Sequence, residues 1–439
     1  MARVKAIARP RLVPTDDMEA QAGRLQARLR RFGSPAALHY DKPVEIVRGD
    51  GALLFDVAGQ PYLDFHAKGV LVGHGNPDIA SAVAAQTARL NVQTRYLHEL
   101  VDVYAERLLA LFPSPLDNVV MTNSGSEAMD LALRTARLVT GRQGVIVTRG
   151  ASHGRTSAAA EISPLFAPRG LPAYVRTIPA PNPAMAGNQK LSAWFAAQVR
   201  EAAQSLAASG AGVAALVADS VFASDGVFTD PPGFLAEAAE AVRAAGGLFI
   251  ADEGRAGFGR VGGMMWGFAR HEMVPDIVVL GRALGNGYPA GAMLTRPDYL
   301  TRAAEEAPFF ASFGANPVAA AAGQAVLETI AEEGLLRHAA RAGEHLRRGL
   351  NSLAKSFMRL DMVRGAGLIL GVDIANPENG EPDPAGARQV VNMMRQNFML
   401  LGIGGAYGQT VKLCPPLCVS LAQLDLFLEN FRAVLSAMG

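Results

Sequence analysis

From about residue 75 onward, short apolar runs that favour β-strands alternate with longer segments of helical periodicity. The runs that predict strands are 118–122, 144–148, 214–219, 247–251 and 277–280. The segments that predict helices between them are 79–90, 97–111, 126–139 and 233–245. Two parallel strands can be joined only by a long crossover, which is usually a helix. The alternation therefore predicts an α/β fold with a mainly parallel sheet that helices cover on both faces.

The length of the chain, 439 residues, suits one large domain with a smaller one attached to it. We predict the large domain over residues 60–320. A long alanine-rich helix, expected at 317–333, leads into a smaller C-terminal α/β domain over 321–439. The N-terminal segment, 1–59, is expected to pack with this small domain.

Local patterns complete the outline at both ends of the chain. Residues 18–32 have the periodicity of a short amphipathic helix. Two strands are predicted at 44–47 and 53–57, separated by a Gly-Asp-Gly turn. Residues 179–189 and 376–384 are expected to be loops because they are rich in proline, glycine and asparagine.

The net charge, the two cysteines and the lack of long apolar segments argue against several classes of protein. A net charge of +1 offers no concentrated basic face for a nucleic acid. Cys414 and Cys418 make neither a metal-type pair nor a disulfide framework, which favours a reducing cytosol. Residues 1–14 lack the apolar run of a signal peptide, and no segment is long and apolar enough to span a membrane. We therefore expect a soluble, cytoplasmic protein without a metal site.

A small-residue turn at 122–128 (Thr-Asn-Ser-Gly-Ser-Glu-Ala) ends one predicted strand and opens a helix. Ser124, Gly125 and Ser126 would expose backbone N–H groups at the start of that helix, which favours an anion such as a phosphate. The alternative is an ordinary capped helix, since serine is a good N-cap residue.

A second candidate is the pair Asp252 and Glu253, which follows a buried strand. Ligands of open α/β sheets bind beyond the carboxyl ends of the strands, where an aspartate can hold a protonated ring nitrogen. The alternative is a structural carboxylate pair held by Arg255 or Arg260. Two further segments, 276–289 and 312–317, could each be only an ordinary strand exit or helix start.

Taken together and in this order, the four segments resemble the class III (ornithine/omega-amino acid type) aminotransferases, which are fold-type I pyridoxal-phosphate enzymes. In detail the likeness is to the branch that holds alanine–glyoxylate aminotransferase-like enzymes and amino-alcohol phosphate phospho-lyases. Further segments that match this branch are 62–65, 73–77, 95–98, 257–260 and 411–416. The resemblance implies a large cofactor-binding domain with a smaller C-terminal domain.

The resemblance also implies roles for several residues. Ser124, Gly125 and Ser126 would cradle the phosphate of pyridoxal 5'-phosphate (PLP), and Asp252 would meet its pyridine nitrogen. Ser312 stands where the family has a threonine that reaches the phosphate of the neighbouring subunit's cofactor. A homodimer with shared active sites is therefore expected.

Four positions depart from the family pattern. Arg282 stands where the family has its Schiff-base lysine, and Ser152 stands where an aromatic ring stacks on the cofactor. Gly254 and Arg255 replace a valine and a glutamine. A guanidinium keeps its proton and has no free lone pair, so Arg282 cannot form the internal aldimine and is a poor base. Drift is one alternative explanation, because the chain has few lysines; an introduced substitution is another.

Three functions remain open. The chain could be an enzyme that binds PLP or its amine form, PMP, without a covalent bond and acts on a small amine or amino acid. It could be repurposed to bind another anionic ligand, favoured by Arg255 and Arg282, or it could be a non-catalytic partner subunit. His153 is a candidate acid or base.

Two lysines are also candidates. Lys68 could supply the amine that position 282 lacks, since a desolvated lysine beside arginines is a better nucleophile or base. The alternative is that Lys68 pairs with Asp64 or Glu253, or points to solvent. Lys412 lies in a segment that often meets a substrate carboxylate in the family, although a surface lysine is the plainer interpretation.

Overall fold

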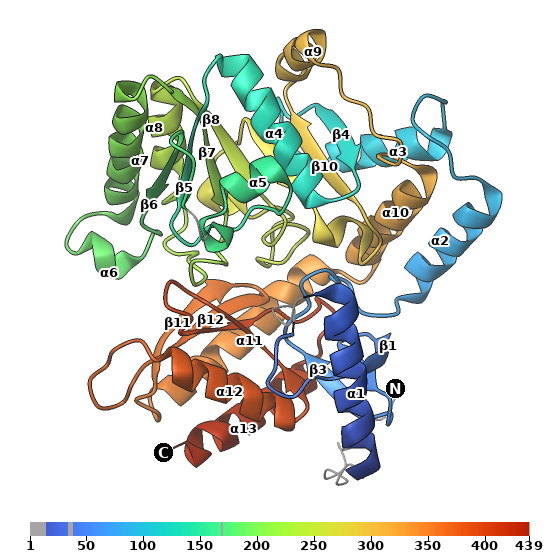
Figure 1. The fold of residues 1–439 in the computed structure, drawn as a ribbon, viewed down its shortest axis with the longest axis vertical. Coiled ribbons are helices and arrows are strands. Elements are labelled where there is room, and N and C mark those ends of the chain that lie inside the picture. The colour runs from blue at the N-terminus through green and yellow to red at the C-terminus, as the bar shows by residue number, and fades with distance from the viewer. Residues whose placement is uncertain (1–14, 34–37, 168–169, 439) are drawn as a thin grey trace.

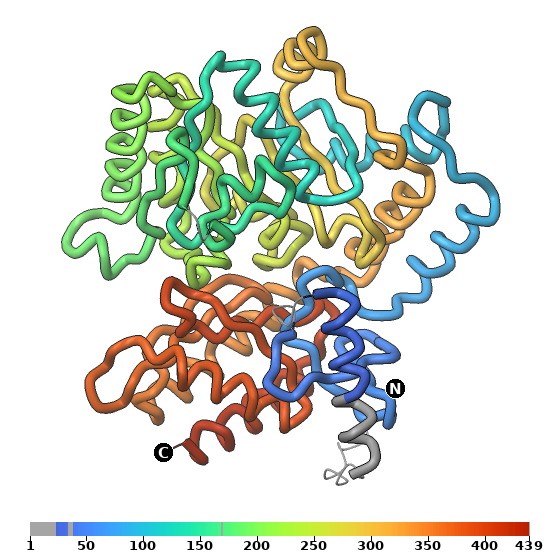
Figure 2. Tube along the Cα trace, in the orientation of Figure 1, coloured from blue at the N-terminus to red at the C-terminus, as the bar shows by residue number. Residues whose placement is uncertain are grey.

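The structure is a computed structural model that describes residues 15–33, 38–167 and 170–438. Residues 1–14, with the expected absence of a signal peptide, lie outside this description. Figure 1 shows a seven-stranded sheet with its helices in the upper part, and two small sheets with the remaining helices in the lower part. The chain passes into the upper part between β3 (Pro61–Asp64) and α2 (Pro77–Arg89), and it returns between α10 (Pro317–Glu332) and α11 (Leu335–Ala354) (Figure 2).

The seven-stranded sheet forms the centre of the upper part. Its strands, in spatial order, are β4 (Asn118–Thr122), β10 (Gly291–Thr295), β9 (Ile277–Leu280), β8 (Leu248–Asp252), β7 (Val213–Asp219), β5 (Gly144–Thr148) and β6 (Val175–Ile178). The pairs from β9 to β6 are all parallel, and β10 alone runs antiparallel to both of its neighbours. The predicted α/β fold with a mainly parallel sheet is therefore confirmed.

Successive residues of the central strands face opposite sides of the sheet. Val145 and Val147 pack into the core beneath α4, whereas Ile146 packs into the core on the side of α7 and α8. The strands are apolar along their whole length because both faces are covered. The helices of the upper part are α2, α3 (Glu99–Leu109), α4 (Gly125–Thr140), α5 (Ser157–Glu161), α6 (Pro183–Ala186), α7 (Leu191–Ala208), α8 (Ala236–Ala244), α9 (Pro297–Glu306) and α10.

The lower part joins the two ends of the chain. One of its sheets has the order β1 (Ile46–Asp50), β2 (Leu53–Asp56), β3 and β13 (Met399–Leu400), so an N-terminal strand pairs in parallel with a C-terminal one. The other sheet has the order β11 (Leu360–Ala366), β12 (Ile369–Ile374), β15 (Thr410–Leu413) and β14 (Gly402–Gly404). Its helices are α1 (Thr15–Phe32), α11, α12 (Pro384–Gln396) and α13 (Leu421–Ala437). The division at residues 59 and 320 stays a prediction.

Some elements differ from the sequence-based expectation. The expected loop at 179–189 is wrong in part, because residues 183–186 form α6, which starts at Pro183 and is capped by Asn182. The expected turn at Gly49-Asp50-Gly51 begins later, since β1 extends through Asp50. Within the described residues, no helix is long and apolar enough to cross a membrane.

Candidate functional site

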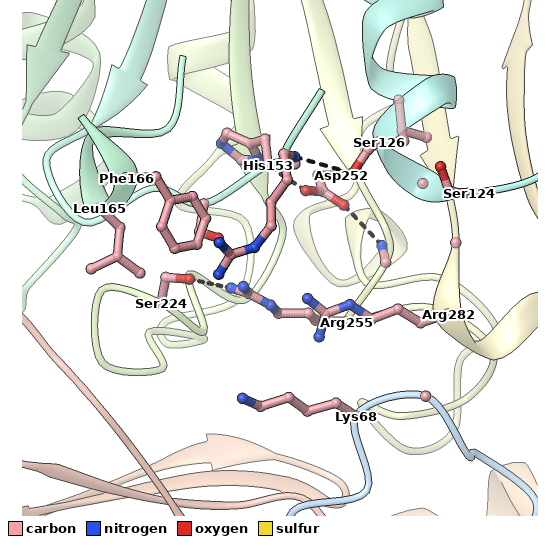
Figure 3. Close-up of a pocket in the computed structure, with 18 of the residues that line it drawn as sticks. Lys68, Ser124, Ser126, His153, Leu165, Phe166, Ser224, Asp252, Arg255 and Arg282 are labelled. Carbon is pink, nitrogen blue, oxygen red and sulfur yellow. Dashed lines mark hydrogen bonds and ion pairs between the residues drawn. The ribbon is translucent and has the colours of Figure 1, made fainter. Parts of the chain in front are cut away.

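A cavity of about 850 Å³ lies where the carboxyl ends of several parallel strands meet the lower part of the molecule. The turns after β4, β5, β8 and β9 line its upper wall, as ligand sites of open α/β sheets do. Lys68, which follows β3, and Lys412, on β15, reach it from the lower part. Figure 3 shows Lys68 extending beneath Arg255 and Arg282 toward the same space.

The N-terminus of α4 forms one side of this cavity. Ser124 caps the helix, with its Oγ accepting the Glu127 backbone N–H at 3.2 Å. Gly125 lies so close to the turn after β9 that a side chain on Gly281 would come within 2.9 Å of the Gly125 Cα. Ser126 Oγ accepts the Arg155 N–H at 3.1 Å, which leaves the hydroxyl hydrogen free to donate. Free N–H groups, a positive helix end and a hydroxyl donor together suit an anion.

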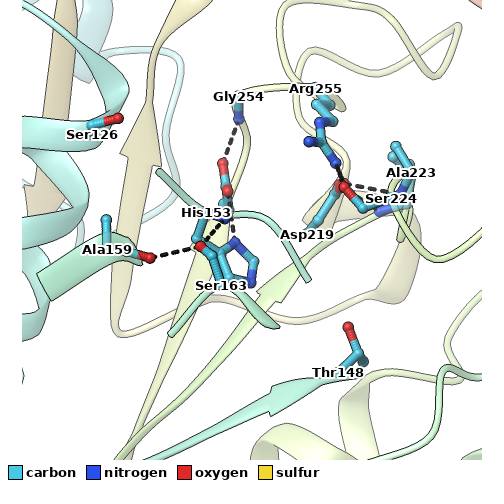
Figure 4. A network of polar contacts seen from close by, with 12 residues as sticks. Ser126, Thr148, His153, Ala159, Ser163, Asp219, Ala223, Ser224, Gly254 and Arg255 are labelled. Carbon is cyan, nitrogen blue, oxygen red and sulfur yellow. Dashed lines mark hydrogen bonds and ion pairs between the residues drawn. The ribbon is translucent and has the colours of Figure 1, made fainter. Parts of the chain in front are cut away.

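Asp252 supplies a fixed negative charge at the end of β8. Its Oδ2 lies 2.8 Å from His153 Nδ1, and its Oδ1 accepts the Gly254 N–H at 3.0 Å (Figure 4). Burial alone would raise the pKa of the Asp252 carboxyl, but His153 and the charge of Arg255 lower that pKa below its usual value. His153 is itself buried, and its backbone N–H donates to Ser163 Oγ at 2.9 Å. The pair offers an ionised carboxylate to a cationic ligand atom.

Glu253 and Arg255 have other partners than expected. The buried Glu253 accepts hydrogen bonds from the Ser220 hydroxyl and from the backbone of residues 267 and 268, and burial raises its pKa to about 7. Arg255 donates to Ser224 Oγ and lies 3.4 Å from Asp219 Oδ2. Arg260 donates to backbone carbonyls. Among the described residues neither Arg255 nor Arg260 forms an ion pair with Asp252 or Glu253, so the expected carboxylate pair held by an arginine is not found, although the charge of Arg255 still favours the ionised form of Asp252.

Arg282 opens the turn after β9 with an unusual backbone. Its φ of 44° is in the left-handed region, which is uncommon for a residue with a side chain and often marks a functional site. Its exposed surface borders the cavity, and burial together with Arg255 lowers its pKa. In the part of the chain that the structure describes, no carboxylate forms an ion pair with it. Asn286, in the same turn, accepts the Leu71 N–H at 2.6 Å and so ties the turn to the segment after Lys68.

Lys68 and Lys412 are the two lysines that line the cavity. Burial, followed by the charges of Arg282 and Arg255, lowers the pKa of Lys68 to about 8, although its side chain is exposed where it borders the cavity. Burial, followed by the charges of Arg255 and Lys68, lowers the pKa of Lys412 to about 7. The alternative in which Lys68 pairs with Asp64 is wrong, because the Asp64 carboxylate contacts His74 at 2.8 Å.

The cavity brings together most of the residues that the sequence singled out. Those that line it are Lys68, Ser124, Gly125, Ser126, Ser152, His153, Asp252, Arg255 and Arg282. Ser312 does not; it is exposed in the loop before α10. Among the described residues, no group of three or more His, Cys, Asp or Glu side chains could hold a metal ion.

Arg155, Phe166 and Ser224 also line the cavity, and the sequence did not predict them as site residues. Arg155 stacks over the Phe166 ring at 4.0 Å at one edge of the cavity, and Ser224 binds Arg255. Nothing in the spacing of residues 155 and 166 signals this contact. Lys412 carried a signal, since it is the only charged residue of the strand Thr410–Leu413. It lines the cavity, so the surface-lysine interpretation is wrong.

Comparisons with known proteins agree with this arrangement. The family profile "Aminotransferase class-III" matches residues 36–435. An alanine–glyoxylate aminotransferase 2-like protein of Drosophila melanogaster is 37% identical over 94% of this chain and 87% of its own. Among solved structures, a phospholyase from Arthrobacter in complex with phosphoethanolamine has a TM-score of 0.91 and 36% identity, covering 95% of this chain and all of that one.

A solved omega transaminase from Pseudomonas jessenii in complex with PMP has a TM-score of 0.84 and 25% identity, covering 95% of this chain and 97% of that one. The predicted fold is thus that of the PLP-dependent aminotransferases of fold type I. The chain belongs to the class III aminotransferase family.

Proposed function

We propose that this chain is a divergent enzyme of the class III aminotransferase family that binds PMP or PLP without a covalent bond and acts on a small amine or amino acid. The observation that carries the proposal is the position of Asp252. A carboxylate that His153 and Arg255 keep ionised lines the same cavity as the anion site of α4. These two features fit the two ends of a pyridine ring that bears a phosphate.

In this proposal the residues have separate tasks. Gly125 and Ser126, at the N-terminus of α4, hold the phosphate. Asp252 pairs with the ring nitrogen, and His153 keeps its carboxylate oriented. The cofactor, when bound, supplies a pyridinium ring that stabilises negative charge on the carbon next to the reacting amine. The complex of a family member with PMP supports this choice of ligand.

Arg282 is the main departure. We place it at the position of the family's lysine because the segment 276–289 matches the family turn that carries this lysine. Its guanidinium stays charged, so it can orient an anionic group but cannot bind an aldehyde covalently. The proton transfers would then require another base, and Lys68 lies in the cavity with a pKa of about 8.

A second function is favoured by the positive side of the cavity. Lys68, Arg282 and Lys412 border it, and within the described ranges none of them has a carboxylate partner. Such a cluster suits an anionic ligand other than PLP. A chain that binds phosphate or a carboxylate but no PMP would fit this alternative.

PMP binding to the purified protein tests the proposal. We expect saturable binding by titration calorimetry, with a near-ultraviolet absorbance band. Asp252→Asn removes the negative partner of the ring nitrogen and should weaken binding about tenfold, as losing a charge-assisted hydrogen bond does. Asp298→Asn, an exposed aspartate at the start of α9, is the matched control and should leave binding unchanged. Binding that is absent at millimolar PMP, or that survives Asp252→Asn, contradicts the proposal.

A further inference from the structure

Lys412 lines the cavity from a strand that is paired on both sides. It occupies the middle of β15, whose neighbours on both sides present glycine at the paired positions, Gly371 on β12 and Gly402 on β14. Its amine lies against Gly404, where a Cβ would be 2.7 Å from Lys412 Nζ. A strand paired on both sides holds its side chain in a more defined place than a loop does. Lys68, by contrast, is on the loop after β3.

The charges around Lys412 disfavour its protonated form. Arg255 and Arg282 cannot lose their protons, and Lys68 adds a third positive charge. Burial is the largest influence on its pKa, these charges lower the pKa further, and Cys414 opposes them, so that the pKa falls to about 7. At neutral pH the neutral form of the Lys412 amine is then much more populated than that of an ordinary lysine, which is almost entirely protonated.

We propose that Lys412 is the reactive amine of this cavity and forms an imine with the aldehyde group of a small ligand. The Nζ lone pair bonds to the carbonyl carbon, and both amine hydrogens leave with the carbonyl oxygen as water. A carbon–nitrogen double bond results, and nothing is oxidised or reduced. The guanidinium of Arg282 has no free lone pair and cannot form such an imine.

The other lysines in the described part of the chain do not fit this role. Lys42, Lys190 and Lys355 are exposed and do not line the cavity. Lys190 also forms an ion pair, with its Nζ 3.2 Å from the carboxylate of Glu237. These three lysines therefore serve as internal standards of ordinary reactivity.

Reductive alkylation with propanal and cyanoborohydride tests the proposal on the intact protein. Propanal is small enough for the cavity and has neither a phosphate nor a ring. After a short pulse at pH 7, mass spectrometry of peptides should show Lys412 alkylated at least about tenfold faster than Lys42, Lys190 and Lys355. At pH 10 this advantage should shrink, because the exposed lysines also become neutral. Equal rates at pH 7, or a label that enters Lys68 first, overturns the proposal.

A matched pair of variants tests the electrostatic part. Lys68→Met removes one neighbouring charge, so the Lys412 amine gains protons and its labelling at pH 7 should slow several-fold. Lys68→Arg keeps the charge and should preserve the labelling rate of the wild type. If Lys412 is labelled equally fast in both variants, the charge at position 68 does not make Lys412 reactive.

The proposal of PMP binding and the proposal of a reactive Lys412 can be contradicted independently of each other. Propanal needs neither the α4 cradle nor Asp252, so Lys412 can be labelled in a protein that binds no PMP. Conversely, PMP binding that depends on Asp252 together with an unreactive Lys412 would leave the proposed function standing and remove only the reactive amine.

Discussion

Arg282 joins a constrained backbone to a side chain that keeps its proton. Arg282 lies in the left-handed region, which costs a residue other than glycine roughly 1–3 kcal/mol of conformational energy. Such a residue keeps this conformation only where the surrounding structure holds it. The close approach of Gly281 to Gly125 and the hydrogen bonds of Asn286 provide such surroundings. The turn would therefore keep its shape when the side chain at position 282 changes.

Arg282→Lys tests how much of the family's chemistry depends on this one side chain. Lysine can bind an aldehyde where arginine cannot, so added PLP should turn the variant yellow and leave a borohydride-stable adduct on residue 282. The wild type should show no pyridoxyl group at this position by mass spectrometry, and Arg282→Gln is the uncharged control. A colourless lysine variant would mean that Ser152 and Gly254 do not seat the ring, and would favour another anionic ligand.

At the scale of single residues, the sequence predicted those site residues that lie in the turns directly after the strands of the large sheet. Ser126, Asp252 and Arg282 could be placed together because the carboxyl ends of parallel strands converge on one edge of a sheet. Phe166 could not be placed, because it follows a short irregular segment, and only the family resemblance brought Lys412 near the site, because β15 belongs to another sheet. Contacts between separate sheets depend on how these pack, and local periodicity contains no information about that.

At the scale of elements, the N-terminus of α4 combines two functions that can be separated. Ser124 accepts the Glu127 N–H and so stabilises the helix, whereas the Ser126 hydroxyl remains free to donate. Ser124→Ala should lower the free energy of unfolding by about 1 kcal/mol, as the loss of an N-cap does, measured by urea unfolding. Ser126→Ala should weaken PMP binding about tenfold with little change in stability. The reverse pattern would contradict this division.

The strands β4, β5 and β9 begin and end where the sequence predicted them, because each is a short apolar run between turn residues. Strand β10 was not predicted, although every one of its residues is buried. It follows β9 after a glycine-rich segment that holds only a short 3-10 helix and no α-helix, so the alternation that marks the parallel strands is missing. The predicted helix 317–333 matches α10 to within one residue.

At the scale of the whole molecule, an apolar surface suggests how two chains associate. Tyr96, Leu97, Phe309, Phe310 and Phe313 are exposed, and we call them the aromatic patch. Arg95 stacks over the Phe310 ring at 4.3 Å, which brings the two loops of the patch together. Leu97 is 99% exposed, which is unusual for a large apolar side chain that has no partner.

We expect the aromatic patch to form the interface of a homodimer, with Ser312 close to the partner's phosphate cradle. Light scattering at micromolar concentration should give twice the mass of one chain. The double variant Leu97→Asp/Phe313→Asp places two charges in the interface and should give a monomer. Met358→Asp changes an exposed apolar residue outside the patch and should remain dimeric.

Because Ser312 would act on the neighbouring site, the monomeric variant should also bind PMP more weakly than the dimer. Ser312→Ala separates this effect from assembly, since it should weaken PMP binding while the mass stays that of a dimer. If the wild-type protein is a monomer, the prediction of a site shared between two subunits is wrong. If the Ser312→Ala variant is a dimer and binds PMP normally, the predicted interface stands and only the predicted role of Ser312 is wrong.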